Sequence, residues 1–339
     1  MDPISQACFG ASLSQSLTRN KASQMSAMII GALAGMAPDL DVLIYSSNDP
    51  LLFLEFHRQF THSLFFIPFG ALICALVFYA VLQTKWLKTA LSFKQVYIFS
   101  FLGYATHGLL DACTSYGTQL YWPFSNARIA WNTVSIIDPL FTLPVIFLVV
   151  LAVLKHKINY ARAGFAWAII YLATGLIQNH RAETAAYELA QFRGHQIERL
   201  HVKPGFGNRH LWKSIYEYKG RYYVDAIKLL WSTEYYYGSS IEKLNVRRDY
   251  PWLPENSQQR KDIERFRWFS DNYLALNPEN KNTIMDVRYS FLPNSIKIMW
   301  GIELNEQEIR EGKTDRHIKY NIDRNLSRKV REEYIDMLF

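Results

Sequence analysis

The first half of this sequence is poor in acidic side chains. Of the 30 aspartates and glutamates in 339 residues, only seven precede His180. They are Asp2, Asp39, Asp41, Asp49, Glu55, Asp111 and Asp138. Because long apolar segments surround several of them, an ionisable group there is costly unless it is paired, hydrated or bound to a metal ion. We therefore treat these carboxylates as candidate functional groups.

The sequence also lacks a disulfide pattern, the motifs of common hydrolases and a basic N-terminal stretch. The three cysteines, Cys8, Cys74 and Cys113, form no CxxC pair, which argues against a disulfide framework and favours buried packing residues. No GxSxG, Walker loop or HExxH occurs, so nothing supports a serine hydrolase, a nucleotide hydrolase or a zincin protease. The first residues lack a basic stretch, and we expect no cleavable signal peptide.

Long apolar segments fill the first 180 residues. A helix needs about 20 residues to cross a bilayer. Five segments come near this length: Met25–Tyr45, His62–Leu82, Val96–Cys113, Val134–Leu154 and Ala163–Asn179. Ser and Gln interrupt a sixth segment, Pro3–Thr18, which we expect to be a marginal helix with its polar face toward the others. The sequence predicts a mainly α fold, with a multi-helix transmembrane bundle over residues 1–180.

Residues 181–339 are polar, charged and rich in aromatic side chains. A hairpin is predicted around Lys219–Gly220, and a second pair of strands on either side of residues 292–295. Helical spacing covers residues 257–276 and the tail at 323–337. We expect a small α+β extramembrane domain over residues 181–339.

The net charge of +7 bears on partners and on orientation. Lys and Arg are scattered without an RNA- or DNA-binding motif, so we expect no nucleic acid partner and favour membrane lipid. Basic residues gather in loops at 19–21, 85–94 and 155–162. With alternating helices these loops share one side, which the positive-inside rule assigns to the cytoplasm. The sequence predicts a multi-pass inner (plasma) membrane protein whose acidic cluster and C-terminal domain are non-cytoplasmic.

Two short motifs combine aspartate and histidine near the ends of apolar segments. Asp39 and Asp41 follow a proline, which can break a helix and turn both carboxylates toward one point. The alternative is a solvated pair at the membrane boundary. His57 and His62 precede a predicted span, and Arg58 beside them can hold a phosphate or carboxylate. The alternative here is an interfacial anchor.

A third motif lies inside an apolar helix. His107 and Asp111 are four residues apart, which places both side chains on one helix face. They can share a metal, or the carboxylate can orient the histidine; a buried hydrogen bond that fixes packing is the alternative. Asp138 precedes a proline, and capping of the next helix and metal ligation both remain open.

Taken in order, four motifs resemble the YdjM-type family of LexA-regulated inner-membrane proteins, described as metal-dependent hydrolases. The motifs are MDPISQ, PDLD, HRQFTHS and HGLLDACTSYGTQLYWPFS, within about the first half of the chain. The resemblance implies a metal site built from Asp39, Asp41, His57, His62, His107 and Asp111. Many relatives have a histidine near the N-terminus where this chain has Asp2 and Gln6, and Asp2 can substitute as a ligand. The order of motifs is also similar to that of zinc-dependent phospholipase C.

The predicted function is metal-activated hydrolysis of an ester or phosphoester in an amphiphilic, lipid-like substrate. A mixed His/Asp set favours Zn²⁺ as the divalent metal. Asp41 or Asp138 would act as general base, and Arg58 would hold an anionic group. Two alternatives stay open: non-enzymatic metal binding or transport with a partner-binding C-terminal domain, and a scaffold with a structural metal.

Overall fold

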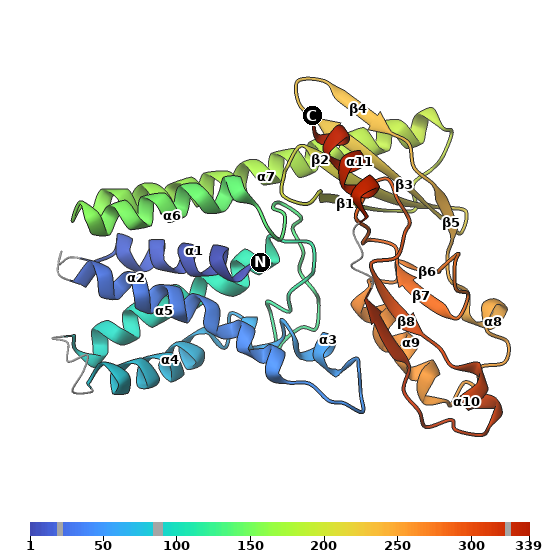
Figure 1. The fold of residues 1–339 in the computed structure, drawn as a ribbon, viewed down its shortest axis with the longest axis horizontal. Helices are drawn as coiled ribbons and strands as arrows, with labels where there is room; N and C mark the ends of the chain where they lie inside the picture. The colour runs from blue at the N-terminus through green and yellow to red at the C-terminus, as the bar shows by residue number, and fades with distance from the viewer. Residues whose placement is uncertain (19–22, 84–90, 323–326) are drawn as a thin grey trace. The chain divides into compact units, whose positions relative to one another are not determined.

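The computed structural model describes residues 1–18, 23–83, 91–322 and 327–339, which form two compact units (Figure 1). The helical unit contains Met1–Leu43, Phe56–Ile177 and Phe206–Arg209. The sheet unit contains Ile44–Glu55, Gln178–Gly205 and His210–Phe339. Helices followed by an antiparallel sheet region are what the sequence predicts. The division suggested after residue 180 falls inside one long helix.

The helices of the first unit follow the apolar segments. They are α1 (Pro3–Ser16), α2 (Gln24–Met36), the 3₁₀ helices η2 (Ala37–Leu43) and η3 (Phe60–His62), α4 (Ile67–Leu82), α5 (Phe93–Ala112), α6 (Pro139–Leu154) and α7 (Ile158–Phe192). α1 packs on α2, α5 and α6, and α4 packs on α5. The basic loop residues at 19–21 and 85–90 lie outside the described part of the chain, so the predicted orientation remains a prediction.

Fewer helices than expected qualify as membrane spans. Within the described residues, Gln24–Leu43 and Ile158–Phe192 are long and apolar enough to cross a bilayer. Leu52–His62 and Ile67–Leu82 together would make a third, but they meet at a bend of 86°. Pro139–Leu154 is shorter. Five or six spans are therefore not confirmed by helix length and hydropathy.

The helical unit has small residues inside and large apolar residues outside. On α4 the buried residues are Gly70, Ala71, Cys74 and Ala75, while Phe69, Leu72, Ile73 and Leu76 are exposed. A Cβ on Gly103 of α5 would overlap the backbone of Gly31 on α2, so this crossing requires glycine. Close approach through small residues is typical of helices that pack within lipid. The exposed apolar surface points to a membrane environment.

Two antiparallel sheets form the second unit. The first contains β1 (Arg199–Pro204), β2 (Leu211–Tyr218), β3 (Arg221–Leu229), β4 (Thr233–Tyr236) and β5 (Ser240–Glu242). The second contains β6 (Leu274–Leu276), β7 (Thr283–Asp286), β8 (Trp300–Glu303) and β9 (Lys319–Ile322). The predicted hairpin is confirmed: Lys219 and Gly220, with φ of 50° and 70°, make the turn between β2 and β3.

Short helices complete the sheet unit. They are most of α3 (Leu52–Phe56), α8 (Val246–Asp249), α9 (Gln258–Phe269), α10 (Glu306–Arg310) and α11 (Arg328–Leu338). The helix predicted over residues 257–276 is shorter than expected, because its last residues pair with β7 as strand β6. The tail is helical from Arg328, and the predicted start at 323–326 lies outside the described residues.

The segment Ile44–Glu55 belongs to the sheet unit although it lies between two parts of the helical unit in sequence. The Arg265 guanidinium on α9 donates two hydrogen bonds to Asp49, at 2.9 and 2.8 Å, and two to Glu55, at 2.6 and 3.0 Å. Leu51 and Leu54 are buried beside them. Bidentate guanidinium–carboxylate pairs are strong and directional, so Arg265 fixes this segment to α9.

Two lysines face each other in the interior of the sheet unit. Lys203 on β1 is the register partner of Lys213 on β2. Lys213 is 1 % exposed and donates to Ser290 Oγ and the Ser295 carbonyl, while the Lys203 ammonium lies 3.8 Å from the Tyr289 ring centroid. Burial lowers the pKa of Lys203 from 10.5 to about 7. Between about pH 7 and pH 10.5, Lys203 therefore holds fewer protons in the folded state than in the unfolded chain.

Consequently, the sheet unit is expected to become more stable as the pH rises from 7 to 9.5. Stability increases with pH wherever the unfolded state binds more protons. Lys203→Met should reduce this increase of stability with pH. Part of the increase should remain in the variant, because burial also lowers the pKa of Lys213. The measurement is the urea midpoint of the sheet's circular dichroism at both pH values. A wild-type midpoint that stays constant or falls would contradict the expectation.

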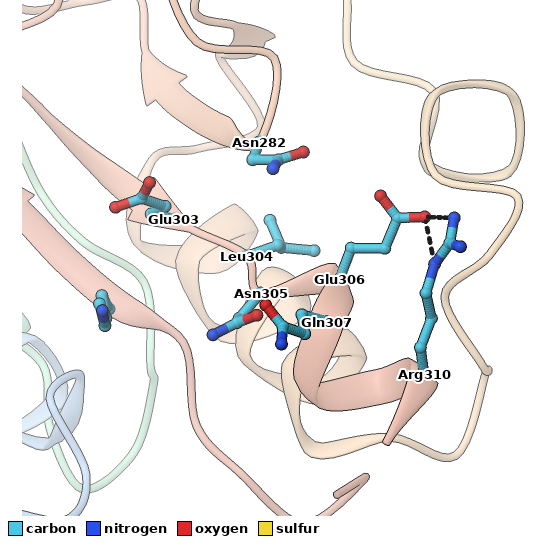
Figure 2. Close-up of a pocket in the computed structure, with 8 residues that line it drawn as sticks. Asn282, Glu303, Leu304, Asn305, Glu306, Gln307 and Arg310 are labelled. Atoms are coloured by element: carbon cyan, nitrogen blue, oxygen red, sulfur yellow. Dashed lines mark hydrogen bonds and ion pairs between the residues drawn. The ribbon is translucent and has the colours of Figure 1, made fainter. Parts of the chain in front are cut away.

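A pocket of about 490 Å³ lies on the surface of the sheet unit (Figure 2). It is lined by Asn282, Glu303, Leu304, Asn305, Glu306, Gln307, Arg310 and Lys319. Glu306 accepts two hydrogen bonds from Arg310 one turn along α10. The lining mixes both signs of charge and contains no histidine, so this pocket offers no set of metal ligands comparable to the cluster in the helical unit.

Candidate metal centre

Four side chains converge at one point inside the helical unit, and we call Asp39, His62, His107 and Asp111 the inner group. Asp39 lies in η2, His62 ends η3, and the other two lie on α5. His62 Nε2 is 2.9 Å from His107 Nε2 and 3.3 Å from both Asp39 Oδ1 and Asp111 Oδ2. The side chains of His62, His107 and Asp111 are fully buried, and that of Asp39 is 27 % exposed.

The outer nitrogens of both histidines have hydrogen-bond acceptors. His107 Nδ1 lies 2.5 Å from the Gly35 carbonyl oxygen, which can only accept, so this nitrogen carries the proton. His62 Nδ1 lies 3.2 Å from Asp41 Oδ2 and 3.0 Å from Thr61 Oγ1. In neutral imidazoles both Nε2 atoms then present bare lone pairs to each other and to two carboxylates. Four converging acceptors call for a positive charge between them, which a metal ion or a proton on His62 Nε2 can supply.

The distances within the inner group fit a metal ion. Zinc binds histidine nitrogen and carboxylate oxygen at about 2.0–2.2 Å, which separates tetrahedral ligand atoms by roughly 3.3–3.6 Å. The four nitrogen–oxygen distances, from 3.3 to 3.6 Å, lie in this range, and the two Nε2 atoms, 2.9 Å apart, are closer than it. The carbonyl and carboxylate on the outer nitrogens are the partners that orient metal-binding histidines. The residues present therefore fit a divalent ion.

A second group of possible ligands shares Asp39 with the first. Asp39, Asp41 and His57 offer one ligand atom each, all within 4.8 Å of one another, and we call them the outer group. His57 Nδ1 lies 2.8 Å from Asp41 Oδ1, and its side chain is 18 % exposed. Asp41 also accepts from the Arg58 amide at 3.0 Å and from Thr61 Oγ1 at 2.9 Å. Asp41 thus orients two histidines at once.

Arg58 lies inside the site. Its Nε is 3.0 Å from Asp111 Oδ2, its Nη1 donates to Thr114 Oγ1 at 3.0 Å, and its guanidinium lies over the Tyr116 ring. Arg58 is 3 % exposed and has a φ of 66°, an uncommon backbone conformation for a non-glycine residue. The Asp41 carboxylate that accepts from the Arg58 amide holds this turn. The guanidinium balances the buried carboxylates.

Two predicted site residues lie outside both groups. Asp2 caps α1, accepting hydrogen bonds from the amides of Ile4 and Ser5. Asp138 caps α6, and the Tyr171 hydroxyl, 2.9 Å from both of its carboxylate oxygens, donates one shared hydrogen bond to them. Both carboxylates satisfy backbone donors at a helix N-terminus, where aspartate is strongly favoured. The structure therefore gives Asp2 and Asp138 capping positions and does not bring them to the metal ligands.

Two residues that support the site, Gln6 and Tyr104, were not among the predicted site residues. Gln6 Nε2 donates to Asp111 Oδ1 at 2.9 Å, and its buried Oε1 has no hydrogen-bond partner among the described residues. The Tyr104 hydroxyl donates to the Thr61 carbonyl at 2.9 Å and holds η3 against α5. The one available signal was the buried polar face expected for Pro3–Thr18, which carries Gln6.

Local sequence explains how the ligands meet. The helix α2 ends at Met36 and the chain tightens into η2 around Pro38, as the proline predicts, which brings Asp39 toward α5. His107 and Asp111 share one face of α5 because they are four residues apart. Gly108 lets the His62 carbonyl approach α5, since a Cβ there would overlap that oxygen. The predicted meeting of these three motifs at one point agrees with this geometry.

Comparison with known proteins places this arrangement in a family. The sequence model of the YdjM inner membrane protein family matches residues 1–182, more than half of the chain. The chain belongs to the YdjM inner membrane protein family. The match covers every residue of the inner and outer groups and ends within α7. In this YdjM family member, most of the sheet unit lies beyond the matched region.

Two curated relatives are similar over part of the chain. Uncharacterized protein YfhP of Bacillus subtilis (strain 168) is 29 % identical over 114 residues, which are 33 % of this chain and 33 % of the relative. Inner membrane protein YbcI of Escherichia coli (strain K12) is 27 % identical over 113 residues, which are 32 % of this chain and 61 % of the relative. The chain thus covers less than two thirds of either relative. No solved structure matches the chain.

Proposed function

We propose that this YdjM family member is a membrane-embedded, metal-dependent hydrolase. The observation that supports the proposal most is the pair of imidazole Nε2 atoms facing two carboxylates, a set of acceptors that calls for a cation. The mixed nitrogen and oxygen ligands suit Zn²⁺ better than Ca²⁺. The inner group would hold one ion with four protein ligands. The outer group, with three ligands and partial exposure, leaves room for water at a second ion.

Each residue of the site has a separate role in this proposal. A bound divalent ion would supply a water of lowered pKa and would polarise the scissile bond. Asp39 would bridge the two groups, and Asp41 would keep His57 and His62 in the orientation that leaves their Nε2 atoms free. His57, the more exposed histidine, would then offer its Nε2 atom to the second ion beside the water. Arg58 would stabilise Asp111 as a carboxylate.

The proposed substrate is the ester or phosphoester of an amphiphilic molecule. Exposed apolar side chains surround the helical unit, and two helices qualify as spans, so a substrate that partitions into lipid reaches this unit at high local concentration. We further propose a multi-pass arrangement with the site on the non-cytoplasmic side, in agreement with the distribution of basic loops in the sequence.

Hydrolysis of phospholipids and of chromogenic phosphoesters by the purified full-length protein in nanodiscs tests this proposal. Activity should disappear after chelation, return with Zn²⁺ or Mn²⁺, and fall by about 10²-fold or more in Asp41→Asn, which removes the charge that orients the two histidines. His180→Ala, at a surface histidine whose side chain is 82 % exposed, is the matched control. Metal-loaded protein that moves the ion across liposomes but cleaves no ester would instead favour the transport alternative.

A further inference from the structure

The turn between β3 and β4 exposes its largest apolar side chain completely. Trp231 at the tip is 105 % exposed and the adjacent Leu230 is 47 % exposed. Tryptophan normally buries much of its surface, and an isolated indole in water at the tip of a hairpin gains nothing from the fold. The tip therefore has the character of a contact surface.

Hydrogen bonds fix this hairpin to one place on α7. Gln178 Nε2 donates to the Leu229 carbonyl at 3.5 Å, and Arg181 Nη2 donates to the Leu230 carbonyl at 3.0 Å. Arg181 Nη1 also donates to Gln178 Oε1 at 2.6 Å, which keeps the guanidinium in place. The tip thus lies beside residues 178–181 of the helix.

The same residues mark the end of the apolar part of α7. No Asp, Glu, Lys or Arg occurs between Arg162 and Arg181, and this stretch makes α7 a candidate membrane span. Leu176 and Ile177, one turn before Arg181, are exposed. A span ends where charged side chains begin, so Arg181 marks the boundary between lipid and water. The hairpin tip is held at that boundary.

We propose that this turn is a membrane-docking surface: Leu230 and Trp231 enter the head-group region of the bilayer that α7 crosses. The partner is lipid, because the turn is bound to α7 where its apolar stretch ends. Tryptophan is the side chain enriched at this depth, since its ring is apolar and its N–H can reach water or head groups. Arg181 favours anionic head groups.

Depth measurements with a spin label on Leu230→Cys test the proposal while keeping Trp231. The three native cysteines are buried, so the label reports the introduced site. In the full-length protein in anionic proteoliposomes, the ratio of oxygen to nickel-chelate collisions should be several-fold higher at residue 230 than at Tyr237→Cys. Tyr237 is 62 % exposed in the same unit, and its ring centroid lies 5.4 Å from the guanidinium of Arg193, which follows the end of α7 and is 12 positions beyond Arg181.

The results separate the possible partners. A collision ratio at residue 230 equal to that at residue 237 would mean that the tip lies in water, and would overturn the proposal. Protection of residue 230 from both oxygen and the nickel chelate would mean that a protein covers the tip, and would overturn it too. Trp231→Ser should lower the ratio at residue 230 if the indole is the anchor. Metal binding and hydrolysis play no part in these readouts.

Discussion

His62→Ala and His107→Ala are each expected to lower metal affinity by more than about 100-fold. Loss of a residue that only orients a ligand typically costs 10- to 100-fold, and each of these histidines would bind the ion directly. Both Nε2 atoms take part in the set of converging acceptors, so either replacement opens the inner group. Elemental analysis of protein purified from zinc-supplemented cells, followed by competition with a chelator, measures the effect.

Size-conserving replacements separate metal loss from misfolding. His62→Gln and His107→Gln keep most of the buried volume, and a helical circular dichroism spectrum equal to the wild type would show that the unit is intact. His180→Ala removes an imidazole whose side chain is 82 % exposed and should leave metal content unchanged. If His62→Ala retained a full complement of metal, the inner group would not be the metal site.

Gly108→Ala is expected to reduce metal binding without removing any ligand. A Cβ at this position of α5 would overlap the carbonyl oxygen of His62, and backbone atoms cannot rotate away as a side chain can. Either η3 or α5 must shift, and a displaced ligand should cost about 10- to 100-fold in affinity. Alanine favours a helix by about 1 kcal/mol over glycine, so helix content should persist. Titration of apo protein with Zn²⁺ gives the affinity.

Gly164→Ala in α7 is the matched control. Its Cβ would meet Leu148 Cβ at 3.3 Å, so that the two helices need to separate by only a few tenths of an ångström. Metal affinity should stay at the wild-type value in this variant. Equal affinity in Gly108→Ala and Gly164→Ala would show that the approach of His62 to α5 is not needed for the site.

The parts of the fold that follow from local pattern were predictable. Apolar stretches gave the positions of α2, α4, α5, α6 and α7, and Lys219–Gly220 gave the β2–β3 turn. The sequence did not reveal that the segment Ile44–Glu55 packs with the sheet unit, because Arg265, which holds it, is more than 200 positions away. The predicted five or six spans are not confirmed, and a run of apolar residues does not show that the chain bends by 86° before α4.

Only part of the candidate site was predictable from the local sequence. The spacing of His107 and Asp111 and the proline before Asp39 predict side chains that meet, and the structure brings them together. Asp2 and Asp138 have the same residue type before a proline, and only the structure shows that their oxygens accept backbone amides. Gln6 was noted only as a position where relatives carry a histidine, and the structure adds that its amide donates to Asp111 Oδ1.

The link between Arg265 and the segment that joins Asp41 to His57 has a consequence for biosynthesis. The contacts of Arg265 with Glu55 and Asp49 span 210 and 216 positions. At a translation rate of about 5–20 residues per second, roughly 10–40 s separate the emergence of these partners from the ribosome. Until then the connection between Asp41 and His57 lacks the restraint that Arg265 supplies.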